Sequence, residues 1–535
     1  MSLNTLSYFR SRLRELIPPD RSRFIFIAFF FLLGMAAFYI FWNYTPFGVG
    51  AGHDSLFYFS AAKNFSSGRG LFWTGSGGEL KPLTHFPPFY SLILAGVSQI
   101  GFPVNLSARL IAAFLFGLNI TLIGIVLYTF TQRILISVLG ASLLMVSPIM
   151  VEAHLQAMSE PAFFFTSFAC FVTLALYINQ PRRSFFILAV LFSALVYLSR
   201  YSGIAVLVAS FLSLLTLGKR PFKVKVRDTF IFIGLASLPI LLWMVRNILL
   251  TGSTTNRGLY IHLINSDTMR QFLDVIFYWF SPKLHSHWLE VAFLSLVFVI
   301  CAAFAWREIR RRCEADRKAP YLVIILLIFS VVYVAFLMVS LSFFDASTRI
   351  SNRILSPLFL AFVLIVMLTM SYSVRRAGQF IFPAVFLFIL FIGPLPYMLQ
   401  QTNQMLTTIQ RSGSGFTSRA WMTSPLIQWL RDLDNESTIV TNQAMAVYFL
   451  TEIPAYQIPE RFDPVKSEER LGYDLEIESL GILLQEPNSY LVLFESSDST
   501  SPSSIDLFEN LQLVLATEDG RVYLTPEVVE TQSSP

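Results

Sequence analysis

Long runs of apolar residues, interrupted by short polar segments, fill the first three quarters of the chain. A helix that crosses a bilayer needs about 20 mostly apolar residues, which gives about eleven candidate spans. The predicted spans are 24–42, 109–130, 134–150, 161–178, 185–199, 202–217, 229–250, 288–306, 321–343, 354–371 and 379–399. This pattern predicts a mainly α-helical, polytopic membrane protein.

One apolar segment is too short for this series. Residues 87–103 end at Gly101-Phe102-Pro103, where the turn residues stop a helix. We predict an interfacial or re-entrant helix here rather than a span. A full span would invert the orientation of every later segment and spoil the distribution of basic loops described below.

The pattern changes near residue 405, where short alternating runs replace the long apolar ones. Strands are predicted at 437–441, 490–494, 511–516 and 521–524, and helices at 421–433 and 478–484. Thr417 or Ser418 is expected to cap the first of these helices. The chain therefore divides into a membrane domain, residues 1–404, with a large loop at 43–108, and a small α/β domain, residues 405–535.

Composition supports this division. Of the 535 residues, 54% are hydrophobic and only 14% are charged, whereas soluble domains carry about 25% charged residues. Two of the three cysteines, Cys170 and Cys301, fall in predicted spans and Cys313 in a basic loop, so no disulfide framework is expected. Residues 405–535 hold 7 Lys and Arg against 20 Asp and Glu, a net charge of −13, and the remaining 32 and 14 give +18.

The basic residues lie in alternate loops, and this pattern orients the chain. Short cytoplasmic loops are enriched in Lys and Arg. These residues are Arg10, Arg12, Arg14, Arg21 and Arg23, then Arg133, Arg182, Arg183, Lys219, Arg220, Lys223, Lys225, Arg227, Arg307, Arg310, Arg311, Arg312, Arg317, Lys318, Arg375 and Arg376. The N-terminus is thus predicted in the cytoplasm and the acidic tail outside it. Basic charge confined to such loops does not indicate nucleic-acid binding.

A polar, aromatic and Gly-rich stretch, residues 52–90, follows the first span. Asp54 and Tyr58 stand one helical turn apart, so 54–65 is predicted to form a short amphipathic helix. A Gly-rich loop comes next, then His85-Phe86-Pro87-Pro88, whose second proline opens another apolar helix.

This order of features resembles the first extracytoplasmic loop of the GT-C membrane glycosyltransferases, the clan of the protein O-mannosyltransferases and the lipid A aminoarabinose transferase. The resemblance implies transfer of a sugar from a polyprenyl phosphate to an acceptor, with Asp54 in the place of the catalytic acid. Two positions depart from the family. Ser55 stands where a second acid is common, and Phe57 stands where the aminoarabinose branch has an arginine.

Glycosyl transfer from a lipid phosphate needs a carboxylate for the acceptor, cations for the departing phosphate and an apolar groove for the prenyl tail. Asp54 is the candidate base. The alternative is that Asp54 only caps a helix starting at Ser55, a position that Asp favours. Glu160, at the outer mouth of a span, is a candidate for acceptor or sugar binding. Its alternative role is to start a helix between Ser159 and Pro161.

Several basic and aromatic residues on the outer side complete the candidate substrate-binding set. A planar guanidinium can bind a phosphate in a bidentate manner. The segments around Arg200, Arg246 and Arg353 resemble family elements. Snorkelling to lipid headgroups is the alternative for each arginine. The remaining members are Tyr58, Lys81 and His85. His85 either contacts the phosphate or tunes Asp54, or it is a structural hydrogen-bonding residue.

These observations together predict an inverting, polyprenyl-phosphate-dependent glycosyltransferase of the bacterial plasma (inner) membrane, embedded among membrane lipids. The acceptor is a lipid, glycan or protein outside the cytoplasm. No cluster of acids or histidines has ligand spacing, so no metal cofactor is predicted to be required. The alternative is a divalent cation bound by Asp54 and Glu160. The alternatives are a transporter or flippase, disfavoured by the absence of visible paired repeats, and a non-catalytic scaffold with a receptor tail.

Overall fold

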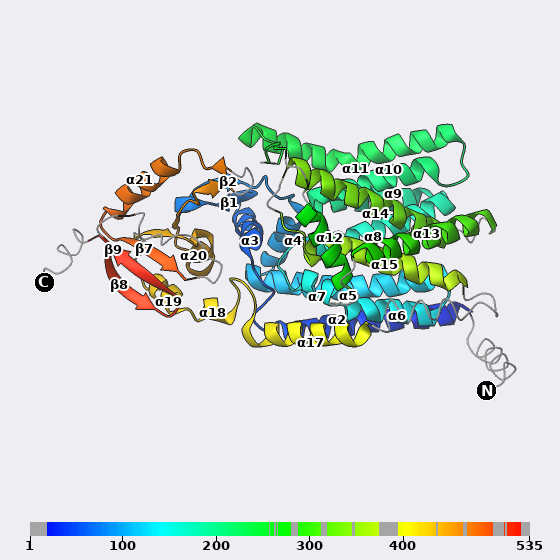
Figure 1. Ribbon diagram of the computed structural model, residues 1–535, viewed down its shortest axis with the longest axis horizontal. Coiled ribbons are helices and arrows are strands. Elements are labelled where there is room, and N and C mark those ends of the chain that lie inside the picture. Colours follow the sequence, from blue (N-terminus) through cyan, green and yellow to red (C-terminus); the bar gives the residue numbers. More distant parts are fainter. Residues whose placement is uncertain are drawn as a thin grey trace.

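The computed structural model describes residues 19–255, 257–261, 264, 266–279, 287–311, 318–344, 348–373, 394–434, 437–463, 468–495, 508 and 511–525. Figure 1 shows a bundle of long helices at one end of the molecule and a small sheet with its helices at the other. The first loop lies between these two parts. The two regimes of the hydrophobic pattern therefore correspond to two ends of the structure.

Six helices in the described part of the chain are long and apolar enough to cross a membrane, and the chain is an integral membrane protein. They are α2 (Pro19–Tyr44), α5 (Val104–Thr131), α8 (Glu160–Asn179), α11 (Phe222–Thr251), α14 (Lys318–Phe343) and α15 (Asn352–Ser373). Three further predicted spans coincide with α9 (Arg183–Ser199), α10 (Ile204–Thr216) and α13 (His287–Arg311). Residues 379–393 lie outside the described residues, and the count of eleven stays a prediction.

The predicted span 134–150 is broken. Helix α6 (Ile134–Met145) and helix α7 (Pro148–His154) meet at an angle of 55°. Pro148 cannot donate a backbone hydrogen bond, so it starts a new helix instead of continuing the old one. Thr402 Oγ1 donates to the carbonyl of Val146, 2.8 Å away, at the break. If the pair counts as one span, the described residues contain seven.

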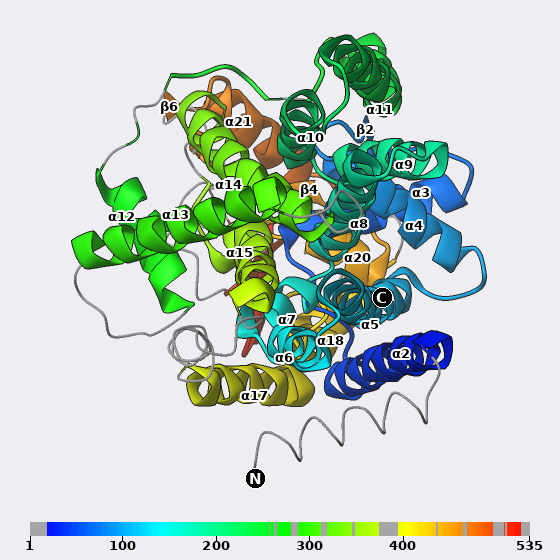
Figure 2. The same cartoon turned by 90° about the vertical axis from the view of Figure 1, so that its right-hand side faces the viewer.

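Viewed along the bundle, α8 lies near its centre, with α5, α9, α10 and α14 around it (Figure 2). Its spanning window is 83% buried, whereas that of α2 at the periphery is only 22% buried. Helix α2 packs along α5, and Gly34 and Gly117 face each other at their contact. Small residues at such a point let two backbones approach closely. The central place of α8 puts its first residue, Glu160, in the middle of the end of the bundle that faces the first loop.

The first loop forms a compact layer above the bundle. It consists of α3 (His53–Ser66), the antiparallel pair β1 (Phe72–Thr74) and β2 (Leu80–Pro82), the short helix η1 (Ser76–Gly78) between them, and α4 (Phe89–Ser98). Helix α3 extends the predicted helix by one residue at each end. Helix α4 has ten residues, too few to cross a membrane.

The C-terminal part is built on a five-stranded sheet in the order β4-β3-β7-β9-β8. Strand β3 is parallel to β4 and β7, and β9 is antiparallel to β7 and β8. The strands are β3 (Thr438–Thr441), β4 (Tyr456–Gln457), β7 (Ser489–Phe494), β8 (Gln512–Thr517) and β9 (Gly520–Leu524), with a separate small pair β5 (Phe462–Asp463) and β6 (Glu468–Glu469). Helices α19 (Pro425–Arg431) and α20 (Ala444–Thr451) cover one face and α21 (Tyr473–Leu484) the other.

The helix predicted over 421–433 is wrong in detail. The structure has α18 (Arg419–Met422), preceded by Ser418, and then α19 as a separate helix. Ser424 Oγ accepts a hydrogen bond from the backbone N–H of Ile427 at 2.9 Å and caps α19, and Pro425 occupies its first position. The Ser-Pro pair therefore divides what the apolar periodicity suggests is one element.

Backbone pairing connects the C-terminal part to the first loop and to the α7–α8 corner. Helix α17 (Leu395–Ser412) continues across residue 405, and the segment after it pairs Gly415 with Ala51. The N–H of Phe416 donates to the Ala51 carbonyl at 2.8 Å, and Gly50 pairs in the same way with Gln156. Gly415 has φ +60°, and a Cβ there would collide with the Ala51 carbonyl, so the pairing requires glycine.

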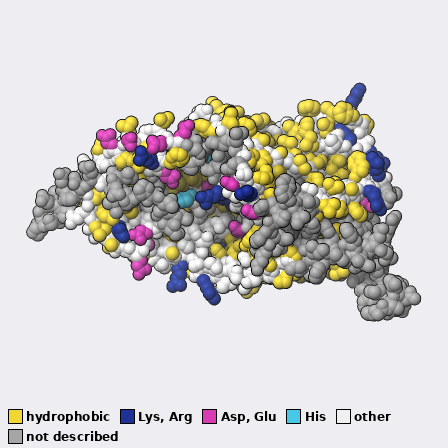
Figure 3. Space-filling model, viewed as in Figure 1, with side chains coloured by type: hydrophobic (Ala, Val, Ile, Leu, Met, Phe, Trp, Pro, Cys, Tyr) yellow, Lys and Arg dark blue, Asp and Glu magenta, His cyan; other side chains and the backbone are white. Residues whose placement is uncertain are grey.

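The orientation of the two ends can be tested with tags. Basic side chains gather at the far end of the helical part and acidic ones around the C-terminal part (Figure 3). A tag fused after the tail should be cleaved by protease added outside intact cells, because the acidic tail is predicted to be extracytoplasmic. A tag in the basic loop 307–320 should be cleaved only after the membrane is opened. Cleavage of both tags from the same side contradicts this orientation.

Candidate functional site

The start of α3 places Asp54 without using it as a cap. Gly52 occupies the N-cap position, and its N–H donates to Ser55 Oγ at 3.1 Å. Asp54 lies inside the first turn, and its side chain is 42% exposed. The alternative reading of Asp54 as the helix cap is therefore wrong, and its carboxylate is accessible.

Arg353 links Asp54 to a second carboxylate. It is the second residue of α15, and its Nη1 lies 3.3 Å from Asp54 Oδ2. Its Nε lies 3.5 Å from Glu160 Oε1. Three residues from distant parts of the sequence thus meet at the first turns of α3, α8 and α15. The guanidinium stands between the two acids, and the Arg353 side chain is 37% exposed.

Glu160 is buried between two arginines. Its Oε1 lies 2.5 Å from Nη1 of Arg200, which follows the last residue of α9. Glu160 is 1% exposed, yet neither carboxylate oxygen accepts a hydrogen bond of regular geometry from the described residues. A buried charge is costly unless it is paired. Burial lowers the pKa of Arg200, but the charge and hydrogen bond of Glu160, together with the nearby Tyr333 and Tyr58, outweigh it and the net shift is upward, so Arg200 stays cationic.

Tyr58 lies behind this cluster, one turn after Asp54. Its hydroxyl is 3.4 Å from Ser159 Oγ, which also accepts from Arg200 Nη1 at 3.5 Å. Tyr58 is 2% exposed, and burial raises the pKa of its phenol, so the ring is neutral. Its ring packs on Phe86 and Tyr90. Tyr58 therefore contacts the start of α8 through Ser159, on the buried side of the cluster.

The other predicted basic residues lie outside the cluster. Arg246 donates to the carbonyls of Leu71 and Leu83, each at 2.9 Å, and stacks on Trp243. It ties the first loop to α11, which is a structural use of its donors. Lys81 pairs with Glu79 at 3.3 Å on the β1–β2 hairpin.

His85 contacts the ring of Phe86, which in turn packs on Tyr58. It belongs to the aromatic layer beside α3. The structure thus brings together Asp54, Tyr58, Glu160, Arg200 and Arg353 out of the predicted set.

A further acid, which the sequence suggests is only an interfacial residue, lies next to this cluster. Glu152, on α7, accepts a hydrogen bond from Asn352 Nδ2 at 3.3 Å. Asn352 directly precedes Arg353, so this contact fixes the start of α15. An amide beside a candidate phosphate-binding arginine was the available signal, but only the fold reveals that α7 faces it.

No group of three or more His, Cys, Asp or Glu side chains is arranged as a metal site in the described part of the chain. Asp54 and Glu160 are bridged by a guanidinium instead. Any ion bound by these two acids would have to displace Arg353. Two acids bridged by an arginine suit an anion better than a hard cation, which prefers several oxygen ligands.

The fold matches solved structures although the sequence matches no family model and no curated protein. ArnT from Cupriavidus metallidurans bound to undecaprenyl phosphate superimposes with a TM-score of 0.56 and 12% identity, covering 93% of this chain and 97% of that chain. The archaeal oligosaccharyltransferase AglB from Archaeoglobus fulgidus, in complex with an inhibitory peptide and a dolichol-phosphate, gives a TM-score of 0.53 and 10% identity, covering 87% and 69%. Both are GT-C membrane glycosyltransferases.

The chain has the GT-C fold. The resemblance noted from residues 52–90 is thereby confirmed at the level of architecture. In this GT-C fold the cluster of Asp54, Glu160 and Arg353 lies where the first loop meets the starts of α8 and α15. Figure 3 shows the face hollowed between the two parts, with basic and acidic side chains gathered there.

Proposed function

We propose that this protein is a glycosyltransferase that moves a sugar from a polyprenyl-phosphate donor to an acceptor outside the cytoplasm. The observation that carries the proposal is the buried Glu160 carboxylate, which holds Arg200 and Arg353 beside the accessible Asp54. The two neighbours of the same fold were solved with a polyprenyl or dolichol phosphate. The apolar membrane helices provide a suitable environment for such a lipid tail.

Each residue has a distinct part in the proposed reaction. Arg353 binds the donor phosphate through its exposed edge. The phosphate then replaces the Asp54 carboxylate as the partner of Arg353, and Asp54 is free to act on the acceptor. Arg200 pairs with Glu160 and neutralises its charge, so that the positive charge of Arg353 is left to pair with the donor phosphate. Preorganised cations of this kind stabilise charge that develops in the transition state.

The proposed step is a single displacement. The acceptor oxygen bonds to the anomeric carbon, the bond from that carbon to the phosphate oxygen breaks, and the electron pair leaves with polyprenyl phosphate. The acceptor proton passes to Asp54, which acts as general base. Attack opposite the leaving phosphate inverts the anomeric configuration. We further propose that the enzyme resides in the bacterial plasma membrane, with this site on its outer face.

The donor lipid tests this proposal directly. Protein purified in mild detergent should retain a polyprenyl phosphate or its sugar conjugate, detectable by mass spectrometry of the extracted lipids. Arg353→Ala should lose most of this lipid, whereas Arg270→Ala should not, because Arg270 is an exposed arginine on α12 (Ser266–Tyr278) away from the site. Wild-type protein that carries no polyprenyl lipid, even after incubation with one in proteoliposomes, contradicts the proposal.

Metal dependence is a separate prediction. Transfer should persist in excess EDTA, because Arg353 and Arg200 supply the positive charge that a cation would otherwise bring. The measurement is transfer by reconstituted protein before and after chelation, with a metal-dependent enzyme in the same buffer as the control. Loss of transfer that Mn²⁺ or Mg²⁺ restores would contradict this prediction and make Asp54 and Glu160 ligands.

A further inference from the structure

A cavity of about 600 Å³ lies on the side of α3 that faces away from Asp54. Asp54 and Tyr58 share one face of this helix. Helix α3 lines the cavity with Leu56, Phe59, Ser60 and Lys63. Their spacing of i, i+3, i+4 and i+7 places them on the opposite face of the helix. The cavity is therefore separated from the candidate reaction site by the width of a helix.

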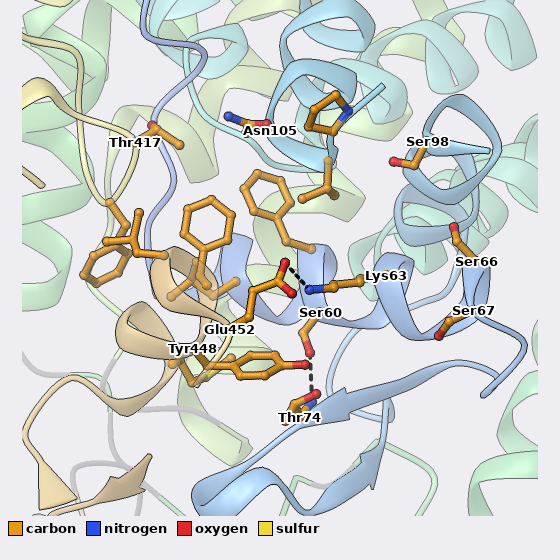
Figure 4. A pocket seen from close by; sticks show the side chains of 18 of the residues that line it. Ser60, Lys63, Ser66, Ser67, Thr74, Ser98, Asn105, Thr417, Tyr448 and Glu452 are labelled. Carbon is orange, nitrogen blue, oxygen red and sulfur yellow. Dashed lines mark hydrogen bonds and ion pairs between the residues drawn. The ribbon is translucent and has the colours of Figure 1, made fainter. Parts of the chain in front are cut away.

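Three other elements complete its walls. The start of α5 contributes Val104 and Asn105, and α20 contributes Tyr448 and Phe449. The segment after α17 contributes Phe416 and others. Figure 4 shows these side chains converging on the space between the first loop and the C-terminal part. The cavity is in the size range of small-molecule sites and is formed only where the two parts of the protein meet.

One side of the cavity is aromatic. The rings of Phe59 and Phe449 lie 5.4 Å apart, and Phe416 and Tyr448 belong to the same lining. Flat ring faces of this kind pack against the C–H faces of a sugar ring as well as against lipid chains. The aromatic side alone does not distinguish these two ligands.

The same lining also carries hydroxyls and an ion pair. Lys63 Nζ lies 2.7 Å from Glu452 Oε1 (Figure 4). Glu452 ends α20 with φ +66°, a left-handed conformation that a glycine or asparagine would adopt more readily. A left-handed residue at this position ends the helix and turns the chain away from it. Here the backbone aims a carboxylate at the rim of the cavity.

The cations of the lining already have partners. Lys63 pairs with Glu452, and Arg431 donates from both Nε and Nη2 to the carbonyl of Leu450. By contrast, Tyr448 Oη and Asn105 Nδ2 have no hydrogen-bond partner among the described residues. Apart from the second carboxylate oxygen of Glu452, which Lys63 does not use, the groups left for a ligand are thus neutral donors and acceptors. This set favours an uncharged polyhydroxyl ligand over a phosphate.

We propose that this cavity is a second carbohydrate-binding site, which takes a short neutral glycan and performs no chemistry on it. The C–H faces of the sugar pack on Phe59 and Phe449, and its hydroxyls bond to Glu452, Tyr448 and Asn105. The proposal goes beyond the transferase function and does not depend on it. A glycan bound there contacts the first loop and the C-terminal part at once.

The test is direct binding of soluble neutral trisaccharides, maltotriose, mannotriose and chitotriose, to the full-length protein in phosphatidylcholine nanodiscs. Saturation-transfer NMR and calorimetry report the contact and the affinity. At least one probe should bind with saturation. Phe449→Ala and Glu452→Gln should each weaken that probe by about tenfold, since each removes one of the two kinds of contact. Thermal unfolding checks that the variants are folded.

Asp54→Asn is the matched control, because it changes a charged side chain on the opposite face of the same helix. It is expected to bind the probe as the wild type does, even where it no longer transfers sugar. Three outcomes overturn the proposal: no probe saturates, binding falls in Asp54→Asn but persists in Phe449→Ala, or a co-purified lipid is present in the wild type and absent only in Phe449→Ala. The last result would assign the cavity to a lipid.

Discussion

Replacement of Asp54 by asparagine is expected to abolish sugar transfer while the protein still folds. Asparagine keeps the shape of the side chain but cannot accept a proton from the acceptor. Loss of a general base lowers rates by about 10²- to 10⁴-fold. Asp54 is not the cap of α3, since Gly52 holds that position, so the substitution should leave the helix intact.

The measurement is transfer by purified Asp54→Asn protein in proteoliposomes, with expression level and thermal unfolding compared with the wild type. Asp474→Asn, an exposed acid in the first turn of α21, is the matched control and should transfer normally. Turnover of Asp54→Asn above a small fraction of the wild type would remove Asp54 from the role of base.

Truncation of Arg353 is the second change with a large expected effect. Arg353→Ala removes the cation that touches both Asp54 and Glu160 and that we assign to the donor phosphate. Truncation of one partner of a fully desolvated charge pair costs about 2–5 kcal/mol of binding, and the Arg353 side chain is 37% exposed, so we expect a loss at the lower end of this range. Arg353→Lys should lose less, because it keeps the charge and loses only the planar fork.

Donor affinity of the two variants, measured with a short-chain polyprenyl phosphate, checks this order. Glu160 keeps Arg200 as a partner in both variants, so the unfolding temperature should change far less than the affinity. Equal donor affinity in the wild type and in Arg353→Ala would exclude Arg353 from the site.

Local patterns in the sequence predicted the elements that depend on nearby residues. Helical spacing of Asp54 and Tyr58 indicated α3, and the alternation in the tail indicated the four longest strands of its sheet. The breaks were harder to predict. At Pro148 and at Pro425 the apolar periodicity continues through the proline, and we gave the periodicity more weight than the missing backbone donor.

The site itself was predictable only as a set of candidates. Asp54, Glu160, Arg200 and Arg353 come from four segments, and their convergence depends on how α8 and α15 pack rather than on any spacing along the chain. The same limit applies to Arg246. Its position on the outer side suggested phosphate binding, but two backbone carbonyls of the first loop take up its donors.

The pairing of Ala51 with Gly415 decides where the tail can be exchanged between related proteins. A junction placed at residue 405, where the composition changes, would fall within α17. It would also replace Gly415, the glycine that pairs with Ala51 in the first loop, and Ala51 lies three residues before Asp54. A chimera should therefore keep this protein's own chain through Thr417, whose hydroxyl donates to the Val49 carbonyl, and change partner at Ser418. The functional unit of the membrane part thus extends beyond its last membrane helix into the chain that leads to the sheet.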